Sequence, residues 1–293
     1  MLNYLAIRTH AMSNDNVNFY ASKNTSPGFF ETIKIFFQEV YSSRYVIWYL
    51  FKRDFIAQFR QKILGYFWIV IAPFMAVLPF IFLTKVGIFR PGDTNMSYPV
   101  FIVIGLGVWG LLTSSFSTVS SCLQQNEDLI KRTNIPKITF ALTAMAAIVY
   151  NLLVHYLVVL IFLILMGETP SVWSILYPFA LLPVLLFGMG LGLLFAVIGT
   201  IARDLSNIIL SLLNLLLFLS PVVYMPNFSH WFLKLIVAWN PFTYLVDFPR
   251  NILVLGTFKE AAGFVFAALF ALFLMLIGVY SFYLIKDRVA EQL

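Results

Sequence analysis

The chain reads TPSVWSILYPFALLPVLLFGMGLGLLFAVIGTIA between Thr169 and Ala202, without a single charged side chain. A helix needs about 20 apolar residues to cross the hydrocarbon core of a bilayer, because each residue advances it by only about 1.5 Å. This stretch is long enough to cross. Every backbone polar group must be satisfied inside lipid, so the stretch is predicted to be helical. We therefore interpret the bilayer as the solvent of this region.

Comparable stretches lie on both sides of it. Together they predict six transmembrane spans, at about 63–84, 98–121, 138–166, 177–201, 205–225 and 261–285. Charged residues make up 11% of the chain, against about 25% in soluble domains, which is too few to cover a water-facing surface. The alternating segments of about ten residues that are typical of a membrane β-barrel are absent. The predicted fold class is an all-α integral membrane protein.

The chain changes character before the first span. Residues 1–28 are polar and are predicted to be a flexible cytoplasmic tail, and residues 29–293 are predicted to form one transmembrane domain. Apolar residues recur at helical spacing over 29–41, at Phe29, Ile33, Phe36, Phe37 and Val40. This segment is too short and too polar to span, so we expect an amphipathic helix that lies in the cytoplasmic interface.

Lysine and arginine are distributed unevenly over the predicted loops. Most of them fall in residues 1–62, in the 122–137 loop, at Arg203 and after Ile285, and these segments share one side if there are six spans. Loops rich in lysine and arginine stay on the cytoplasmic side. We therefore expect a multi-pass membrane protein with both termini in the cytoplasm.

The stretch between the fifth and sixth spans is apolar but interrupted by proline. Residues 220–258 are too apolar for a loop in water, and they contain Pro221, Pro226, Pro241 and Pro249. A single straight helix cannot continue through these prolines. Two short re-entrant helices, roughly 228–238 and 242–255, would dip into the outer leaflet and return. The alternative is a flat helical cap in the interface with no role in substrate passage.

Several catalytic motifs are missing. The chain has no G-x-x-x-x-G-K-[ST] phosphate loop and no H-E-x-x-H, and its one cysteine is Cys122. These absences argue against an ATPase of the P-loop type and against a metal enzyme. We expect no catalytic residue, no metal site and no cofactor bound by this chain. His155, inside the third span, is interpreted as a neutral imidazole that is hydrogen-bonded to a neighbouring helix.

Two predicted cytoplasmic turns carry charge of both signs. The first is predicted to form a short helix before Pro136 and holds Glu127, Asp128, Leu129, Ile130, Lys131 and Arg132. Its mixed charge suits docking on a soluble partner, where Leu129 and Ile130 would fill a groove. The second is compact and begins with Arg203 and Asp204. The alternative for the first segment is an ordinary solvated turn.

Three motifs in the order of the predicted spans carry a resemblance. RDF at 53–55, RQKILGYFW at 60–68 and Pro73 precede and open the first span. SPVVY at 220–224 ends the fifth span, and NPFTYLV at 240–246, followed by Arg250, precedes the sixth. From about Phe29 onward the chain resembles the permeases of ABC-2 type exporters. Within that family it looks most similar to exporters of O-antigen, capsule and teichoic acid polysaccharides.

This resemblance implies a homodimer of permeases with two copies of a separate ATP-binding subunit, which binds ATP and Mg²⁺. The assembly would move a lipid-pyrophosphate-linked polysaccharide outward across the cytoplasmic membrane. Glu127–Arg132 would be the main coupling helix and Arg203–Ser206 a second contact. The helix at 29–41 would form a cytoplasmic gate, and the re-entrant helices would lie on the periplasmic side.

Two sets of residues fit the passage of such a substrate. Aromatic rings stack on the C–H faces of sugars without fixing register, and rings near the outer gate are Tyr224, Trp231, Trp239, Phe242, Tyr244 and Phe248. Trp and Tyr also gather at membrane interfaces as anchors. Four cations could attract the lipid-linked pyrophosphate at the inner side, namely Lys52, Arg53, Arg60 and Lys62. Pairing with anionic lipid head groups is their alternative role.

Two other functions remain open. One is an ABC-2 permease for a drug or a small lipid. The other is a membrane-embedded enzyme that acts on polyprenyl-phosphate sugars, which would need acidic residues gathered at the membrane surface. The candidates Asp54, Glu127, Asp128 and Asp204 lie on separate predicted elements. We therefore favour the hypothesis of polysaccharide export over that of a membrane-embedded enzyme.

Overall fold

A computed structural model describes residues 28–60, 67–89, 92, 94–225 and 230–289. Those residues form helices and their connections, and no strand occurs among them. The predicted tail lies outside the described residues, apart from Gly28. The helices are α1 (Phe29–Ser42), α2 (Arg44–Arg60), α3 (Phe67–Lys85), α4 (Tyr98–Ser120), α5 (Cys122–Gln125), α6 (Glu127–Arg132), α7 (Lys137–Leu165), the 3₁₀ helix η1 (Val172–Leu176), α8 (Tyr177–Ala180), α9 (Leu182–Ile201), α10 (Arg203–Leu219), α11 (Trp231–Trp239), α12 (Pro241–Val254) and α13 (Ala261–Val289).

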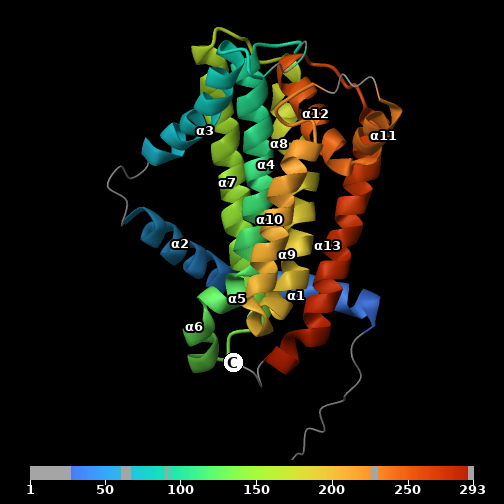
Figure 1. Ribbon diagram of the computed structural model, residues 1–293. Coiled ribbons are helices and arrows are strands. Elements are labelled where there is room, and N and C mark those ends of the chain that lie inside the picture. The colour runs from blue at the N-terminus through green and yellow to red at the C-terminus, as the bar shows by residue number, and fades with distance from the viewer. Residues whose placement is uncertain (1–27, 61–66, 90–91, 93, 226–229, 290–293) are drawn as a thin grey trace, which may run out of the picture.

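Long apolar helices stand side by side in a bundle that includes α4, α7, α9, α10 and α13 (Figure 1). Four segments are long and apolar enough to cross a membrane, at Tyr98–Ser120, Lys137–Leu165, Val172–Gly199 and Ala261–Lys286. They coincide with the second, third, fourth and sixth predicted spans. The first and fifth predicted spans correspond to shorter apolar segments, Ile71–Lys85 and Asp204–Leu219. The prediction of an all-helical protein with helices long and apolar enough to cross a membrane is confirmed for the described residues.

The bundle has two distinct ends. One end, here called the α6 end, holds α1, α5 and α6, and the other, the α12 end, holds α8, α11 and α12 (Figure 1). α4 lies at the centre, because 67% of its apolar window is buried, against 22% for α13. The segments of α1, α5 and α6 were predicted to share one side of a membrane, and they lie together at the α6 end of the molecule (Figure 1).

Close approach of α9 and α13 depends on glycine. A Cβ on Gly190 would lie 2.6 Å from Met275 Cα, and a Cβ on Gly278 would collide with the Gly190 carbonyl oxygen. Real Cβ atoms do not approach other atoms this closely, so a side chain at either position would push the helices apart. Small residues at helix contacts are typical of membrane bundles, where dispersion and shape complementarity stabilise packing.

α1 crosses the α6 end against the bundle. Phe36 and Val40 pack against the core as the apolar spacing predicts, whereas Phe37 is 65% exposed. Tyr283 Oη of α13 donates a hydrogen bond to Glu39 Oε2 at 2.5 Å. Glu39 therefore faces the bundle together with Phe36 and Val40, and Phe37 lies on the outer side of the helix.

α11 and α12 occupy the proline-rich region, where two short helices were expected at roughly 228–238 and 242–255. Pro241 opens α12, where its missing N–H costs nothing, and Asn240 Oδ1 accepts a hydrogen bond from Phe242 N at 3.0 Å. Pro249 lies inside α12 and does not end it. The helix bounds agree with the sequence to within a few residues.

Candidate functional site

The charged helix α6 projects from its end of the molecule (Figure 1). Glu127 and Asp128 lie in its first turn and Lys131 and Arg132 in its last, so the side-chain charges complement the helix dipole. Lys131 Nζ pairs with Glu127 Oε1 at 2.6 Å. Such an exposed pair contributes about 0.3–0.5 kcal/mol. The sequence prediction of a short helix over these residues is confirmed.

The two apolar residues of α6 face inward. Leu129 and Ile130 are half-buried and pack against the core of the bundle. Asp128, Lys131 and Arg132 are exposed. In this chain by itself, α6 therefore offers a charged surface to solvent and uses its apolar pair to hold its own position.

The second predicted contact lies at the same end. Gln124 of α5 donates its amide to the carbonyl oxygen of Gly199, near the C-terminus of α9. Asp204, at the start of α10, is exposed, while the Arg203 side chain lies outside what the structure describes. The fold thus brings the start of α10 to the end of the bundle that also carries α6.

α2 is tied to the corner before α6 through Arg53. Its guanidinium pairs with the Asp54 carboxylate at 2.7 Å and donates to Asn126 Oδ1 at 3.0 Å. Asn126 in turn donates its Nδ2 to the Cys122 carbonyl oxygen at 2.9 Å. Asn126 directly precedes α6, so this hydrogen bond joins α2 to the start of α6.

The other predicted cations are less defined. Lys52 is exposed on α2, next to Arg53. The Arg60 side chain and all of Lys62 lie outside the described residues. Of the four cations singled out from the sequence, the structure describes the side chains of two, Lys52 and Arg53. Both are exposed on α2.

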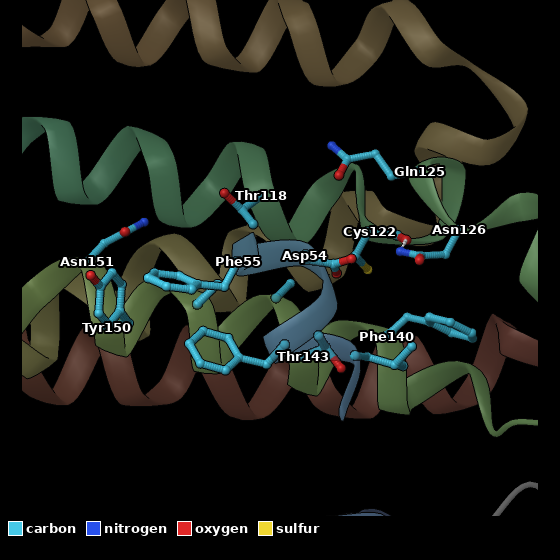
Figure 2. Close-up of a pocket in the computed structure, with 14 residues that line it drawn as sticks. Asp54, Phe55, Thr118, Cys122, Gln125, Asn126, Phe140, Thr143, Tyr150 and Asn151 are labelled. Carbon is cyan, nitrogen blue, oxygen red and sulfur yellow. Dashed lines mark hydrogen bonds between the residues drawn. The ribbon is translucent and has the colours of Figure 1, made fainter. Parts of the chain in front are cut away.

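A cavity of about 290 Å³ lies between α2, the α4–α5 junction and α7. Figure 2 shows the residues that line it, with Asp54 of α2 near Cys122 and Phe55 of α2 near Tyr150 of α7. Its described lining combines apolar, aromatic and polar side chains, namely Leu50, Phe51, Asp54, Phe55, Thr118, Cys122, Gln125, Asn126, Phe140, Thr143, Ala144, Ala147, Tyr150 and Asn151. Sequence analysis assigned no role to this set, although Asn151 inside an apolar span is the kind of residue that marks a functional position.

The described lining of the cavity includes one thiol, Cys122, and one carboxylate, Asp54. Burial raises the pKa of the Cys122 thiol to about 12, against the smaller opposite effect of its backbone hydrogen bonds. The thiol is therefore almost fully protonated at neutral pH and is a poor nucleophile. No group of three or more His, Cys, Asp or Glu side chains that could hold a metal occurs among the described residues.

At the α12 end, a buried arginine joins three elements. Arg250 of α12 is only 1% exposed, and its Nη2 donates to the Val222 carbonyl oxygen at 2.8 Å. Its Nη1 pairs with Asp247 at 2.7 Å and donates to the Pro221 carbonyl oxygen at 3.4 Å. The Arg250 guanidinium also lies 3.6 Å from the centroid of the Phe101 ring. Arg250 thereby fixes the chain after α10 to both α12 and α4.

Gly105 of α4 makes room for this arginine. A Cβ at Gly105 would lie 2.5 Å from Arg250 Nη2 and would collide with the Val222 carbonyl oxygen.

A second polar contact, which is partly buried, lies between α7 and α8, where His155 Nε2 and Tyr177 Oη are 2.9 Å apart. The interpretation of His155 as an imidazole bonded to a neighbouring helix is confirmed.

The predicted aromatic residues divide into two groups. Phe242 and Phe248 are buried inside the chain, where Phe242 meets the Phe187 ring and Phe248 stacks on Phe264 at 4.1 Å between centroids. Trp231 and Trp239 of α11 are 75% and 78% exposed. Tyr224 and Tyr244 are half-buried and donate to carbonyl oxygens, of Phe218 and Ala238 respectively. The exposed rings therefore belong to α11.

α10 carries a polar stripe on an exposed face. Asn207, Ser211 and Asn214 are spaced four and three residues apart, so they lie on one side of the helix, and all three are exposed. Polar side chains rarely face lipid. This stripe therefore indicates a surface that meets protein or water, and its spacing was readable in the sequence.

Comparisons with known proteins agree with the resemblance. The family model for ABC-2 type transporter matches residues 45–254. An O-antigen export system permease protein RfbA of Klebsiella pneumoniae is 25% identical over 261 residues, which cover 85% of this chain and 98% of that protein. An RfbA of Myxococcus xanthus is 26% identical, covering 64% and 71%. The polysialic acid transport protein KpsM of Escherichia coli is 24% identical, covering 78% and 89%.

Proposed function

The chain belongs to the ABC-2 type transporter family, and from this premise we propose that it is the permease subunit of an exporter of lipid-linked polysaccharide in the bacterial cytoplasmic membrane. Relatives named for O-antigen export and for polysialic acid transport support polysaccharide as the cargo. The observation that carries most weight is the alignment along 98% of an O-antigen export permease, because it includes both ends of the bundle.

A separate subunit would supply the energy. That partner binds ATP and Mg²⁺ and docks on α6, whose exposed Asp128, Lys131 and Arg132 offer charges of both signs. The start of α10, with Arg203 and Asp204, provides the second contact at the same end. This chain itself carries out no ATP chemistry.

The working unit would be a homodimer. The exposed stripe Asn207, Ser211 and Asn214 on α10 supports this arrangement, because a second copy or a water-filled path removes these side chains from lipid. The exposed rings Trp231 and Trp239 would then lie at the outer mouth, where a sugar chain can slide over them. α11 and α12 would be re-entrant on the periplasmic side.

The α6 end would face the cytoplasm, together with both termini. Lys52 and Arg53, exposed on α2, would attract the pyrophosphate of the lipid carrier there. α1 would act as a gate beside them. Arg60 and Lys62 would add charge to the same region.

Deletion of the gene, followed by complementation, tests the proposal. The test variant replaces Glu127, Asp128, Lys131 and Arg132 with alanine, and the control replaces Lys85 and Lys259, exposed residues at the opposite end. We expect surface polysaccharide to return with the wild type and the control. The four-residue variant should reach the membrane but fail to co-purify the ATP-binding subunit and fail to export.

Two results would contradict the proposal in different ways. Normal surface polysaccharide in the deletion strain would rule out polysaccharide export by this chain. Normal co-purification and export with the four-residue variant would rule out α6 as the docking helix while leaving the cargo unchanged.

A further inference from the structure

The cavity at the α6 end has no part in the function proposed so far. It lies between α2 and the bundle helices α4, α5 and α7 (Figures 1 and 2). This is the end of the molecule where the substrate would be loaded. Its volume of about 290 Å³ is at the lower limit of small-molecule sites, which measure about 300–1,000 Å³. It has room for a single small ring and not for a polymer.

Polar groups of the cavity can both donate and accept hydrogen bonds. Thr118, Tyr150 and Asn151 present hydroxyl and amide groups, which have both capacities. Gln125 donates a hydrogen bond from its Nε2 to Ser121 Oγ at 2.8 Å. Its amide oxygen is an additional acceptor. Such a mixed set suits a ring of hydroxyl groups, because each hydroxyl is at once a donor and an acceptor.

Aromatic rings also line the cavity, next to these polar groups. Phe55 of α2 and Tyr150 of α7 meet edge to face at 4.8 Å between centroids, and Phe51 lies 5.9 Å from Phe55. Aromatic rings bury apolar surface efficiently. A sugar has an apolar C–H face and a polar rim, so one wall of the cavity can bury its face while the amides and hydroxyls meet its rim.

The charge of the lining favours a neutral ligand. None of the described residues that line the cavity is lysine or arginine, and Asp54 contributes a carboxylate. Asp54 is already paired with Arg53 at 2.7 Å, so this carboxylate and its partner add no net charge, and the described lining offers a phosphate group no unpaired cation. Lys52 and Arg53 lie outside the lining, on the same helix, where an anionic group can stay in water.

We propose that this cavity binds a single neutral sugar ring of the lipid-linked glycan, while the pyrophosphate stays outside it beside Lys52 and Arg53. The inference rests on the proposed function for its source of ligand. It adds that the permease recognises the sugar itself and not only the lipid and its charge.

The position of Asn126 gives this recognition a consequence. Asn126 lines the cavity, accepts a hydrogen bond from Arg53 of α2, and directly precedes α6. A sugar bound in the cavity would therefore contact Asn126, the residue that links α2 to α6. By linkage, if the ligand favours one position of α6, a partner that favours the same position strengthens ligand binding.

The test uses the complete permease–ATPase complex in lipid nanodiscs. Three polyprenyl pyrophosphates, carrying glucose, galactose or N-acetylglucosamine, compete with a tritiated polyprenyl pyrophosphate that carries no sugar. We expect the wild type to bind at least one of the three about tenfold more tightly than the bare lipid, the effect of one or two net hydrogen bonds plus ring burial.

Three variants on α7 examine the site. Ala147→Phe fills the cavity, Asn151→Leu removes an amide at similar volume, and Tyr150→Phe removes a hydroxyl but keeps the ring. The first two should reduce the preference to about one- to twofold, and Tyr150→Phe should lower it in part. Val149→Ala, at a residue of the same helix that is 47% exposed and outside the lining, should keep the full preference.

Each outcome decides the matter. Equal binding of all four lipids by a monodisperse wild-type complex overturns the proposal, and so does a full preference in Ala147→Phe. Loss of preference in Val149→Ala as well would also overturn it, because the effect would not belong to the cavity. The proposed function is judged separately, by surface polysaccharide in the deletion strain, so failure of one does not imply failure of the other.

Discussion

Replacement of Arg250 with alanine should destabilise the α12 end of the molecule more than any exposed substitution. The wild-type guanidinium pairs with Asp247 at 2.7 Å, donates to Val222 at 2.8 Å and covers the Phe101 ring. Arg250→Ala removes all of these contacts at once. The Asp247 carboxylate and two backbone carbonyl groups then remain without this cation in a largely buried place.

The magnitude follows from these contacts. Removal of one partner of a buried ion pair costs about 3–5 kcal/mol of unfolding free energy. The Asp247 side chain keeps 21% exposure, so water solvates part of the charge and the lower value of about 3 kcal/mol is appropriate. A buried carbonyl left unsatisfied adds about 1 kcal/mol. A total of about 3–4 kcal/mol corresponds to a fall in Tm of about 6–16 °C.

The assay is thermal unfolding in detergent micelles, followed as loss of the monodisperse peak in size-exclusion chromatography. Arg250→Lys keeps the charge but loses the fork that reaches two carbonyls and Asp247 together, so it should recover only part of the loss. An independent test comes from Gly105, whose Cβ would lie 2.5 Å from Arg250 Nη2. Gly105→Ala should lower Tm, since overpacking costs about 1–3 kcal/mol.

Gly110 is the matched control on the same helix, because a Cβ there would meet no atom within 4 Å. Gly110→Ala should raise stability slightly, by up to about 1 kcal/mol, through helix propensity. The two glycine variants are thus expected to differ in sign. The reasoning fails if Arg250→Ala and Gly105→Ala both unfold within about 2 °C of the wild type, a shift that corresponds to less than about 1 kcal/mol.

Three further outcomes are expected. Cys122, whose pKa burial raises to about 12, has a negligible thiolate fraction at pH 8, so maleimide should label it only slowly until the protein is denatured; rapid labelling of the folded chain would contradict this environment. Gly190→Leu should separate α9 from α13 and lower Tm by several degrees, about the effect of 1–3 kcal/mol of overpacking, while Gly110→Leu should not; equal Tm values for the two would refute the close contact. Trp231→Ala with Trp239→Ala should slow polysaccharide export without altering the yield of the assembled complex, as measured by pulse labelling of surface polymer; an unchanged export rate would exclude these rings from the path.

Local features of the chain were sufficient for the helices themselves. The uncharged run from Thr169 to Ala202 predicts a span because lipid demands internal hydrogen bonding, and η1, α8 and α9 lie within it. A short helix at about Glu127–Arg132, before Pro136, was expected, and α6 forms there with acids in its first turn and bases in its last. Pro241 marked the start of α12 for a similarly local reason.

Contacts between distant segments were not readable in this way. Phe242 and Phe248 look like Trp231 and Trp239 in the sequence, yet the first pair is buried and the second exposed. Aromatic residues suit a core, an interface and a sugar path equally well, so only the packing of α12 against its neighbours decides between them.

The sequence by itself predicted that lipid is the solvent of this chain, where its long apolar helices lie, and that a charged helix follows the second span, because these depend on composition and short-range spacing. The tertiary structure alone decided that Arg250 lies against Gly105 and the Val222 carbonyl, and that α2 closes a cavity with Tyr150 and Asn151. Such sites are assembled from separate helices and connections, whose residues lie 28 positions apart for Arg250 and Val222, and well over that for Arg250 and Gly105. Their chemistry depends on which helix faces meet, and no local pattern records that.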